Sequence, residues 1–123
     1  MPNDAPTPVQ VYFTPEFKRN VRQLAKKYRH IKTDIQPLID QLAQRETPGD
    51  RIAGVSYRVF KVRVKNSDLG KGKSGGYRVI YYLVREDSVV LVTLYSKPEQ
   101  GDIAADEIRR IITNLDMNEE QVQ

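Results

Sequence analysis

Residues 57–85 read YRVFKVRVKNSDLGKGKSGGYRVIYYLVR, and this stretch decides the fold. It contains eight Lys or Arg residues and a single carboxylate, Asp68. In its first half, residues 60–65 (FKVRVK) alternate between apolar and cationic side chains. Because successive side chains of a strand point to opposite faces, this alternation predicts a strand with one apolar and one cationic face. A rigid sheet that carries a row of cations is suited to holding a phosphate backbone.

The composition limits the kinds of chemistry that are available. The chain has 123 residues, which is enough for one compact domain. It has no Cys and one His, His30, so disulfides, thiolate metal sites and clusters of His ligands are excluded. We therefore expect no metal and no cofactor. The net charge of +4 is modest, and its distribution is more informative.

Positive and negative charges occupy different parts of the chain. Residues 15–29 hold six cations and one anion, whereas residues 99–120 hold seven anions and two cations. This separation predicts a basic face for an anionic partner. Residues 1–8 are expected to form a loose arm, and they lack the basic and apolar regions of a signal peptide. With no long apolar run in the chain, we expect a cytoplasmic protein without a membrane partner.

The N-terminal half predicts a strand followed by two helices. Residues 9–14 alternate as a strand, and Thr14-Pro15 is typical of a helix start, with Thr as the N-cap and Pro at the first helical position. Apolar residues then recur at helical spacing to residue 28, and again over residues 31–43. In the second helix, Thr33 and Gln36 are expected to form a capping box.

The C-terminal half predicts three strands and a closing helix. After a loop at 50–56, the two strands of the 57–85 stretch are followed by an internal strand at 89–95, which is apolar on both faces. Asp102 is expected to cap the last helix. The predicted fold is therefore α+β, with an N-terminal strand and a helical hairpin packed on a mainly antiparallel four-stranded sheet, and a C-terminal helix. The domain would cover residues 9–115, and residues 116–123 would form a polar tail.

Three segments of the sequence resemble the RelE/ParE superfamily of toxins, in particular its RelE and HigB branches: FKVRV at 60–64, GGYRVIYYL at 75–83 and LYSKPE at 94–99. The resemblance covers residues 9–115. The family's basic site positions correspond to Lys61, Arg63, Arg78 and Lys97, and Tyr82 lies near its strand Tyr. The family's Tyr near the closing helix corresponds to about Ile103, and Tyr95 is a candidate to replace it.

The resemblance implies an endoribonuclease that cleaves mRNA in the translating ribosome. It also implies a cognate antitoxin that neutralises the toxin. Two other functions stay open on the sequence. One is a ParE-like toxin that inhibits DNA gyrase, and the other is a non-catalytic module that binds RNA or an antitoxin. The set formed by Lys61, Arg78 and Lys97 favours the nuclease.

RNA cleavage without a metal ion requires proton transfer at two oxygens and stabilisation of the phosphoryl group. Arg63 and Arg78 are the candidates for binding the phosphoryl oxygens, because the guanidinium fork matches them and stays charged. Lys61 is the candidate for proton transfer, since crowding by other cations would lower its pKa. Lys97 or Tyr95 is the candidate acid. The predicted RNA-binding residues are Lys65, Lys71, Lys73, Tyr82, Arg22 and Lys26, with Tyr82 stacking on a base.

Overall fold

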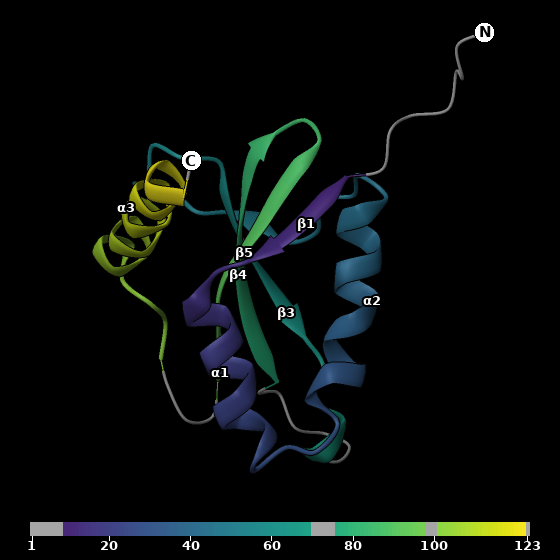
Figure 1. Ribbon diagram of the computed structural model, residues 1–123. Helices are drawn as coiled ribbons and strands as arrows, with labels where there is room; N and C mark the ends of the chain where they lie inside the picture. The colour runs from purple at the N-terminus through teal and green to yellow at the C-terminus, as the bar shows by residue number, and fades with distance from the viewer. Residues whose placement is uncertain (1–8, 70–75, 98–100, 123) are drawn as a thin grey trace, which may run out of the picture.

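The computed structural model describes residues 9–69, 76–97 and 101–122, of which residues 116–122 are described by their backbone only (Figure 1). Within these ranges the chain forms one sheet and three α-helices. In chain order the elements are β1 (Gln10–Phe13), α1 (Pro15–Ala25), α2 (Ile31–Ala43), β2 (Asp50–Arg51), β3 (Val59–Val64), the 3-10 turn η1 (Ser67–Leu69), β4 (Tyr77–Arg85), β5 (Ser88–Ser96) and α3 (Ala105–Val122).

The strands are ordered β1-β5-β4-β3-β2 across the sheet. β1 runs parallel to β5, and the other neighbours are antiparallel. The long antiparallel pairing of β3, β4 and β5 confirms the predicted α+β fold and places the 57–85 stretch at the centre of the sheet. The segments at 9–14 and 89–95 are strands as predicted.

The sheet has five strands where the sequence predicts four. The additional strand, β2, pairs Asp50 with Lys61 and Arg51 with Phe60, inside the segment expected to be a loop. The backbone of Gly49 makes this pairing possible. A Cβ atom built at Gly49 would lie 2.3 Å from the Lys61 carbonyl oxygen, and the residue has a φ of +92°. Glycine tolerates both the close approach and the positive φ, so β2 can lie against the backbone of Lys61.

The two faces of the sheet carry separate apolar clusters. α1 and α2 cover one face, where Phe17, Leu42, Tyr77 and Tyr81 are buried together. α3 lies against the other face, where Ile80 packs with apolar residues of β5 and of the helix. Figure 1 shows α3 apart from the pair formed by α1 and α2. Tyr77 and Tyr81 thus point toward the helical hairpin, as the alternation along β4 predicts.

Thr14 ends β1 and starts α1. Its Oγ1 accepts a hydrogen bond from the Phe17 amide at 2.9 Å, which confirms the predicted N-cap, and Pro15 follows it. The same hydroxyl donates to the Val92 carbonyl at 2.7 Å. Six residues later, the Asn20 side-chain oxygen accepts from the Leu94 amide at 3.1 Å. Side chains of α1 therefore take over the outer edge of β5 where β1 stops.

α2 begins earlier than its predicted capping box. The helix starts at Ile31, which is fully buried, and His30 occupies the N-cap position without a side-chain cap. The prediction of a box at Thr33 is wrong, because burial of Ile31 sets the first turn. His30 instead binds Asp68 in η1. Its backbone amide donates to the carboxylate at 2.9 Å, and its ring nitrogen lies 2.8 Å from the second carboxylate oxygen.

α3 begins at Ala105 and continues to Val122, through the segment expected to be a tail. Its first turn is closed by the Ala104 carbonyl, which accepts from the Glu107 and Ile108 amides. Asp102 is therefore too early in the chain to cap this helix, and the predicted cap is wrong. The expected arm at residues 1–8 lies outside the described residues. In this region the structure shows a different role for Asp102.

Candidate active site

A row of three polar side chains crosses the sheet at one end of β3, β4 and β5. Arg63 is directly opposite Arg78, and Arg78 is directly opposite Tyr95. Directly opposed residues share a face, so all three project on the same side. This is the face that α3 partly covers, because Ile80, two residues from Arg78, packs in the cluster beneath that helix. The alternation of side chains along the strands thus builds the row.

Two lysines join the row through a common carboxylate. The Nζ atoms of Lys61 and Lys97 lie 3.6 and 3.4 Å from the same oxygen, Oδ1 of Asp102. Lys61 comes from β3, Lys97 follows β5, and Asp102 precedes α3, so three separate segments meet here. The structure therefore brings Lys61 and Lys97 together on the side of the sheet where Arg78 and Tyr95 project. We call Lys61, Arg78, Tyr95, Lys97 and Asp102 the cation cluster.

Burial and charge differ among the members of the cation cluster. Arg78 is only 8% exposed and Tyr95 only 4%, so they form its floor. Burial is the main cause that raises the pKa of the Tyr95 phenol, and the charge of Asp102 adds to it, while Arg78 and the Ile103 amide act in the opposite direction. Tyr95 therefore keeps its proton at neutral pH and is suited to donate a hydrogen bond.

Asp102 is the member of the cluster that the sequence did not reveal as a site residue. Its carboxyl pKa is lowered, first by the charge of Lys61 and then by that of Lys97. The sequence predicted that Lys61 would be crowded by other cations. The structure instead places the carboxylate of Asp102 beside its ammonium group, so the surroundings of Lys61 are not purely positive. The signal in the sequence was a lone Asp shortly after Lys97, which is equally typical of a helix cap.

The model of one protein family matches residues 9–119, and that family is described as the RelE toxin of the RelE / RelB toxin–antitoxin system. This chain belongs to the RelE toxin family. It is thus the toxin of a toxin–antitoxin system, and its expected protein partner is a RelB-like antitoxin. Among residues 9–69, 76–97 and 101–122, no helix is long and apolar enough to cross a membrane. The same part of the chain holds no group of three or more His, Cys, Asp or Glu residues arranged to bind a metal.

A polar pocket of about 330 Å³ adjoins the cation cluster of this RelE-family toxin. It lies between α1 and the end of β5, and it shares Tyr95 with the cluster. Its other lining residues are Asn20, Gln23, Leu24, Lys27, Leu94 and Ser96. The Ser96 hydroxyl is buried and has no hydrogen-bond partner among the described residues. The pocket therefore offers polar groups and space on the α1 side of β5, whereas the side chain of Tyr95 projects on the other side with Arg78.

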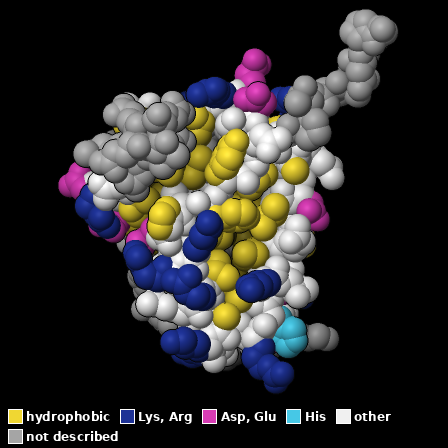
Figure 2. All heavy atoms as spheres, in the orientation of Figure 1, with side chains coloured by type: hydrophobic (Ala, Val, Ile, Leu, Met, Phe, Trp, Pro, Cys, Tyr) yellow, Lys and Arg dark blue, Asp and Glu magenta, His cyan; other side chains and the backbone are white. Residues whose placement is uncertain are grey.

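The other predicted RNA-binding residues lie away from the cluster. Tyr82 is half-buried in the apolar cluster beneath α3, where its ring packs edge-on against Tyr57 with centroids 5.2 Å apart. Lys65 follows the end of β3 and lines a hollow with α2. Arg22 and Lys26 are exposed on the side of the sheet that α1 and α2 cover, where Figure 2 shows Lys and Arg side chains gathered over α1. Lys71 and Lys73 lie outside the described residues.

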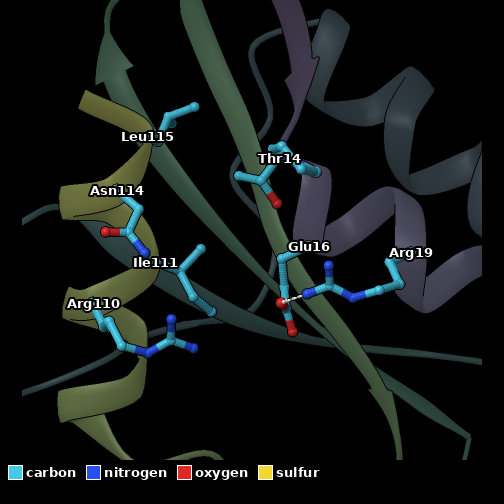
Figure 3. A pocket seen from close by; sticks show the side chains of 8 residues that line it. Thr14, Glu16, Arg19, Arg110, Ile111, Asn114 and Leu115 are labelled. Atoms are coloured by element: carbon cyan, nitrogen blue, oxygen red, sulfur yellow. Dashed lines mark hydrogen bonds and ion pairs between the residues drawn. The ribbon is translucent and has the colours of Figure 1, made fainter. Parts of the chain in front are cut away.

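A second hollow, of about 180 Å³, separates the start of α1 from α3 (Figure 3). Two arginines line it, but each has a glutamate partner on its own helix. Arg19 pairs with Glu16, and Arg110 pairs with Glu107. The charge of Glu16 also acts on Arg110, and both glutamates raise the pKa of its guanidinium. The positive and negative charges around this hollow therefore nearly cancel. It is less suited to binding an anion than the cation cluster is.

Proposed function

We propose that this toxin is a metal-independent endoribonuclease that cleaves mRNA on the ribosome and thereby stops translation in the cytoplasm. The observation that carries the proposal is the convergence of Lys61 and Lys97 on one oxygen, at 3.6 and 3.4 Å, beside the buried row of Arg78 and Tyr95. A site with several cations and a protonated phenol matches the needs of phosphodiester cleavage. Membership of the RelE family supports the same function.

In the proposed reaction, the ribose 2′-oxygen attacks the adjacent phosphorus and the bond to the 5′-oxygen breaks. The 2′-OH gives its proton to a water molecule, and the 5′-oxygen gains one from the enzyme as it leaves. Arg78 binds two phosphoryl oxygens, because its guanidinium can donate two parallel hydrogen bonds and its buried position fixes its direction. Arg63, exposed at the end of the row, binds the same or the next phosphate.

The lysines and the tyrosine supply protons and hydrogen bonds. The Nζ atoms of Lys61 and Lys97 meet at one point beside the row, so we assign one of these ammonium groups to protonation of the leaving 5′-oxygen. Tyr95 donates a hydrogen bond to the phosphoryl group, since its raised pKa keeps the phenol neutral.

The position of the basic residues of α1 fits a second contact, with ribosomal RNA. Arg22 and Lys26 lie on the side of the sheet that α1 and α2 cover, whereas the cation cluster lies on the side that α3 partly covers. One side of the molecule can thus bind ribosomal phosphates while the other cleaves mRNA. Binding through such phosphate contacts depends strongly on salt.

Mapping transcript ends after induced expression tests the proposal. The wild-type toxin should produce new 5′ ends within translated codons, and Lys61→Ala should abolish them. Lys32→Ala is the matched control, because Lys32 is exposed on α2 and lies outside the cluster. DNA breaks without mRNA cuts would instead show a gyrase inhibitor. Absence of both cuts and growth arrest would show a binding module. Cleavage by purified toxin on ribosomes should continue in EDTA concentrations that leave the ribosome intact.

A further inference from the structure

The place where the cation cluster would bind an RNA phosphate already holds an anion. One oxygen of Asp102 lies within ion-pair distance of both Lys61 and Lys97. We propose that the Asp102 carboxylate is an internal competitor for the substrate phosphate, because it occupies in the free protein the position that a phosphate oxygen takes in the complex. This inference rests on the proposed function, from which it takes the identity of the phosphate as that of RNA.

The contacts of Asp102 are those of a bound anion. Carboxylate and phosphate oxygens both accept charged hydrogen bonds from ammonium groups at similar distances. The two lysines come from different segments of the chain, and both pair with the same carboxylate oxygen. Asp102 also lies close to the Tyr95 phenol, whose pKa its charge helps to raise. Its carboxylate therefore pairs with both lysines of the cation cluster and acts electrostatically on Tyr95.

The carboxylate is also placed so that it can leave. Its side chain is 62% exposed, and it belongs to the non-helical residues 101–104 that lead into α3. It does not cap the helix, so α3 does not depend on its position. Exposed ion pairs contribute little net free energy, since water replaces them readily. A phosphate that brings additional contacts can therefore displace Asp102.

Competition by Asp102 lowers the affinity of the cation cluster for every anion. Lys61 and Lys97 lower the pKa of its carboxyl, so the competitor stays charged at neutral pH. A ligand that offers a single phosphate gains little by displacing it. A strand held by further contacts along its length still binds. Asp102 therefore favours extended or anchored RNA over free nucleotides and isolated phosphates.

Binding of an uncleavable RNA measures the competition directly. The probe is a fluorescent 2′-O-methyl RNA octamer, which lacks the attacking hydroxyl, and the full chain is titrated by anisotropy at several salt concentrations. Asp102→Asn should bind the octamer about three- to tenfold more tightly, as expected for removing one nearby charge in a partly hydrated site. The logarithmic salt dependence should change by less than about 0.7, because lysine neutralises the same phosphate in both proteins once it has displaced Asp102.

Asp106→Asn is the charge-matched control. It changes the net charge by the same amount, but Asp106 lies in α3, is 91% exposed and pairs with Arg109. Its affinity should stay within about twofold of wild type, as for a screened surface charge. In a Lys61→Met, Lys97→Met background, Asp102→Asn should give no gain, because the contested position no longer exists.

The outcomes separate this proposal from the nuclease. Unchanged or weaker binding by Asp102→Asn would mean that Asp102 merely holds the lysines together, and would overturn the proposal. A gain that persists without the lysines, or no measurable binding by either protein at low salt, would overturn it as well. Tighter binding by Asp102→Asn together with no RNA cleavage by wild-type toxin would support the competitor and reject the nuclease.

Discussion

The two faces of the sheet are built from the same strands, and they differ in what covers them. On one face, α1 and α2 enclose a continuous apolar cluster that includes Tyr77 and Tyr81. On the other, α3 packs over Ile80 and its neighbours, and the end of the face carries the cation cluster. Alternate residues of one strand thus stabilise the fold and form the site. Substitutions one position apart along a strand should therefore affect different properties.

Phe17→Ala, on the face that α1 and α2 cover, should have the largest effect on stability. Phe17 is 2% exposed and lies in the cluster beneath α1. Its removal should lower the free energy of unfolding by about 3–5 kcal/mol, from lost burial and the remaining cavity. Urea denaturation measures this change. RNA cleavage per folded molecule should stay near wild type, and a specific loss of cleavage would contradict the separation of the two faces.

Arg78→Ala should show the opposite pattern. The loss of a preorganised charge at the phosphoryl group should reduce the cleavage rate about 10²–10³-fold, which corresponds to roughly 3–4 kcal/mol. Single-turnover cleavage on ribosomes measures it. Arg85→Ala, at the exposed far end of β4, is the control and should retain activity. Arg78→Lys should restore little, because an ammonium group cannot make the paired hydrogen bonds of the guanidinium.

Gly49→Ala should link stability to the site. A Cβ atom there would be 2.3 Å from the Lys61 carbonyl, whereas Gly54, with a similar φ of +84°, has nothing within 4 Å. Gly54→Ala should therefore cost only the backbone strain, about 1 kcal/mol. Gly49→Ala should cost more and should also reduce cleavage, since β3 must move. Equal losses in the two variants, measured by denaturation and cleavage, would show that β2 does not position Lys61.

The smallest expected effect is a pH dependence at the corner between α1 and α2. The hydrogen bonds from the amide and ring of His30 lower the carboxyl pKa of Asp68. The resulting stabilisation is fully present above the unfolded-state pKa of about 3.9 and is lost as the pH falls through the lower folded-state value. Asp68→Asn should therefore weaken the fall in stability below about pH 4. Asp87→Asn, in the turn before β5, should not. Urea midpoints between pH 2 and 7 test this, and parallel curves for wild type and Asp68→Asn would refute it.

Local signals predicted much of the fold. The alternation at 60–65 and the Thr14-Pro15 pair each depend on neighbouring residues, and both describe the structure correctly. The strand β2 was missed, because two residues give no periodic pattern and their pairing depends on the contact of Gly49 with β3. The helix α2 starts at Ile31, as the apolar spacing over residues 31–43 predicts, but the capping box at Thr33 was wrong for a similar reason: the burial of Ile31 decides the start, rather than the cap chemistry of Thr33.

The candidate site could likewise be predicted only where neighbouring residues or a family motif carry the signal. Alternation places Lys61 and Arg63 on one face, and the family resemblance adds Arg78 and Lys97; the structure brings these side chains to one end of the sheet. Their roles in catalysis stay predictions. Asp102 joins the cation cluster only in the folded chain, because its carboxylate pairs with ammonium groups from two other segments. Tyr82 shows the reverse case, since packing under α3 takes most of its ring away from solvent.

The hydrogen bonds that Thr14 and Asn20 make with β5 have a consequence for self-association. Beyond Leu91, where β1 no longer pairs, the Val92 carbonyl and the Leu94 amide would be free to recruit a strand from another molecule. The two side chains occupy these groups instead. An apolar replacement at either position would uncover backbone that templates intermolecular sheets. The side chains of Thr14 and Asn20 therefore protect this edge of β5 against edge-to-edge pairing between molecules.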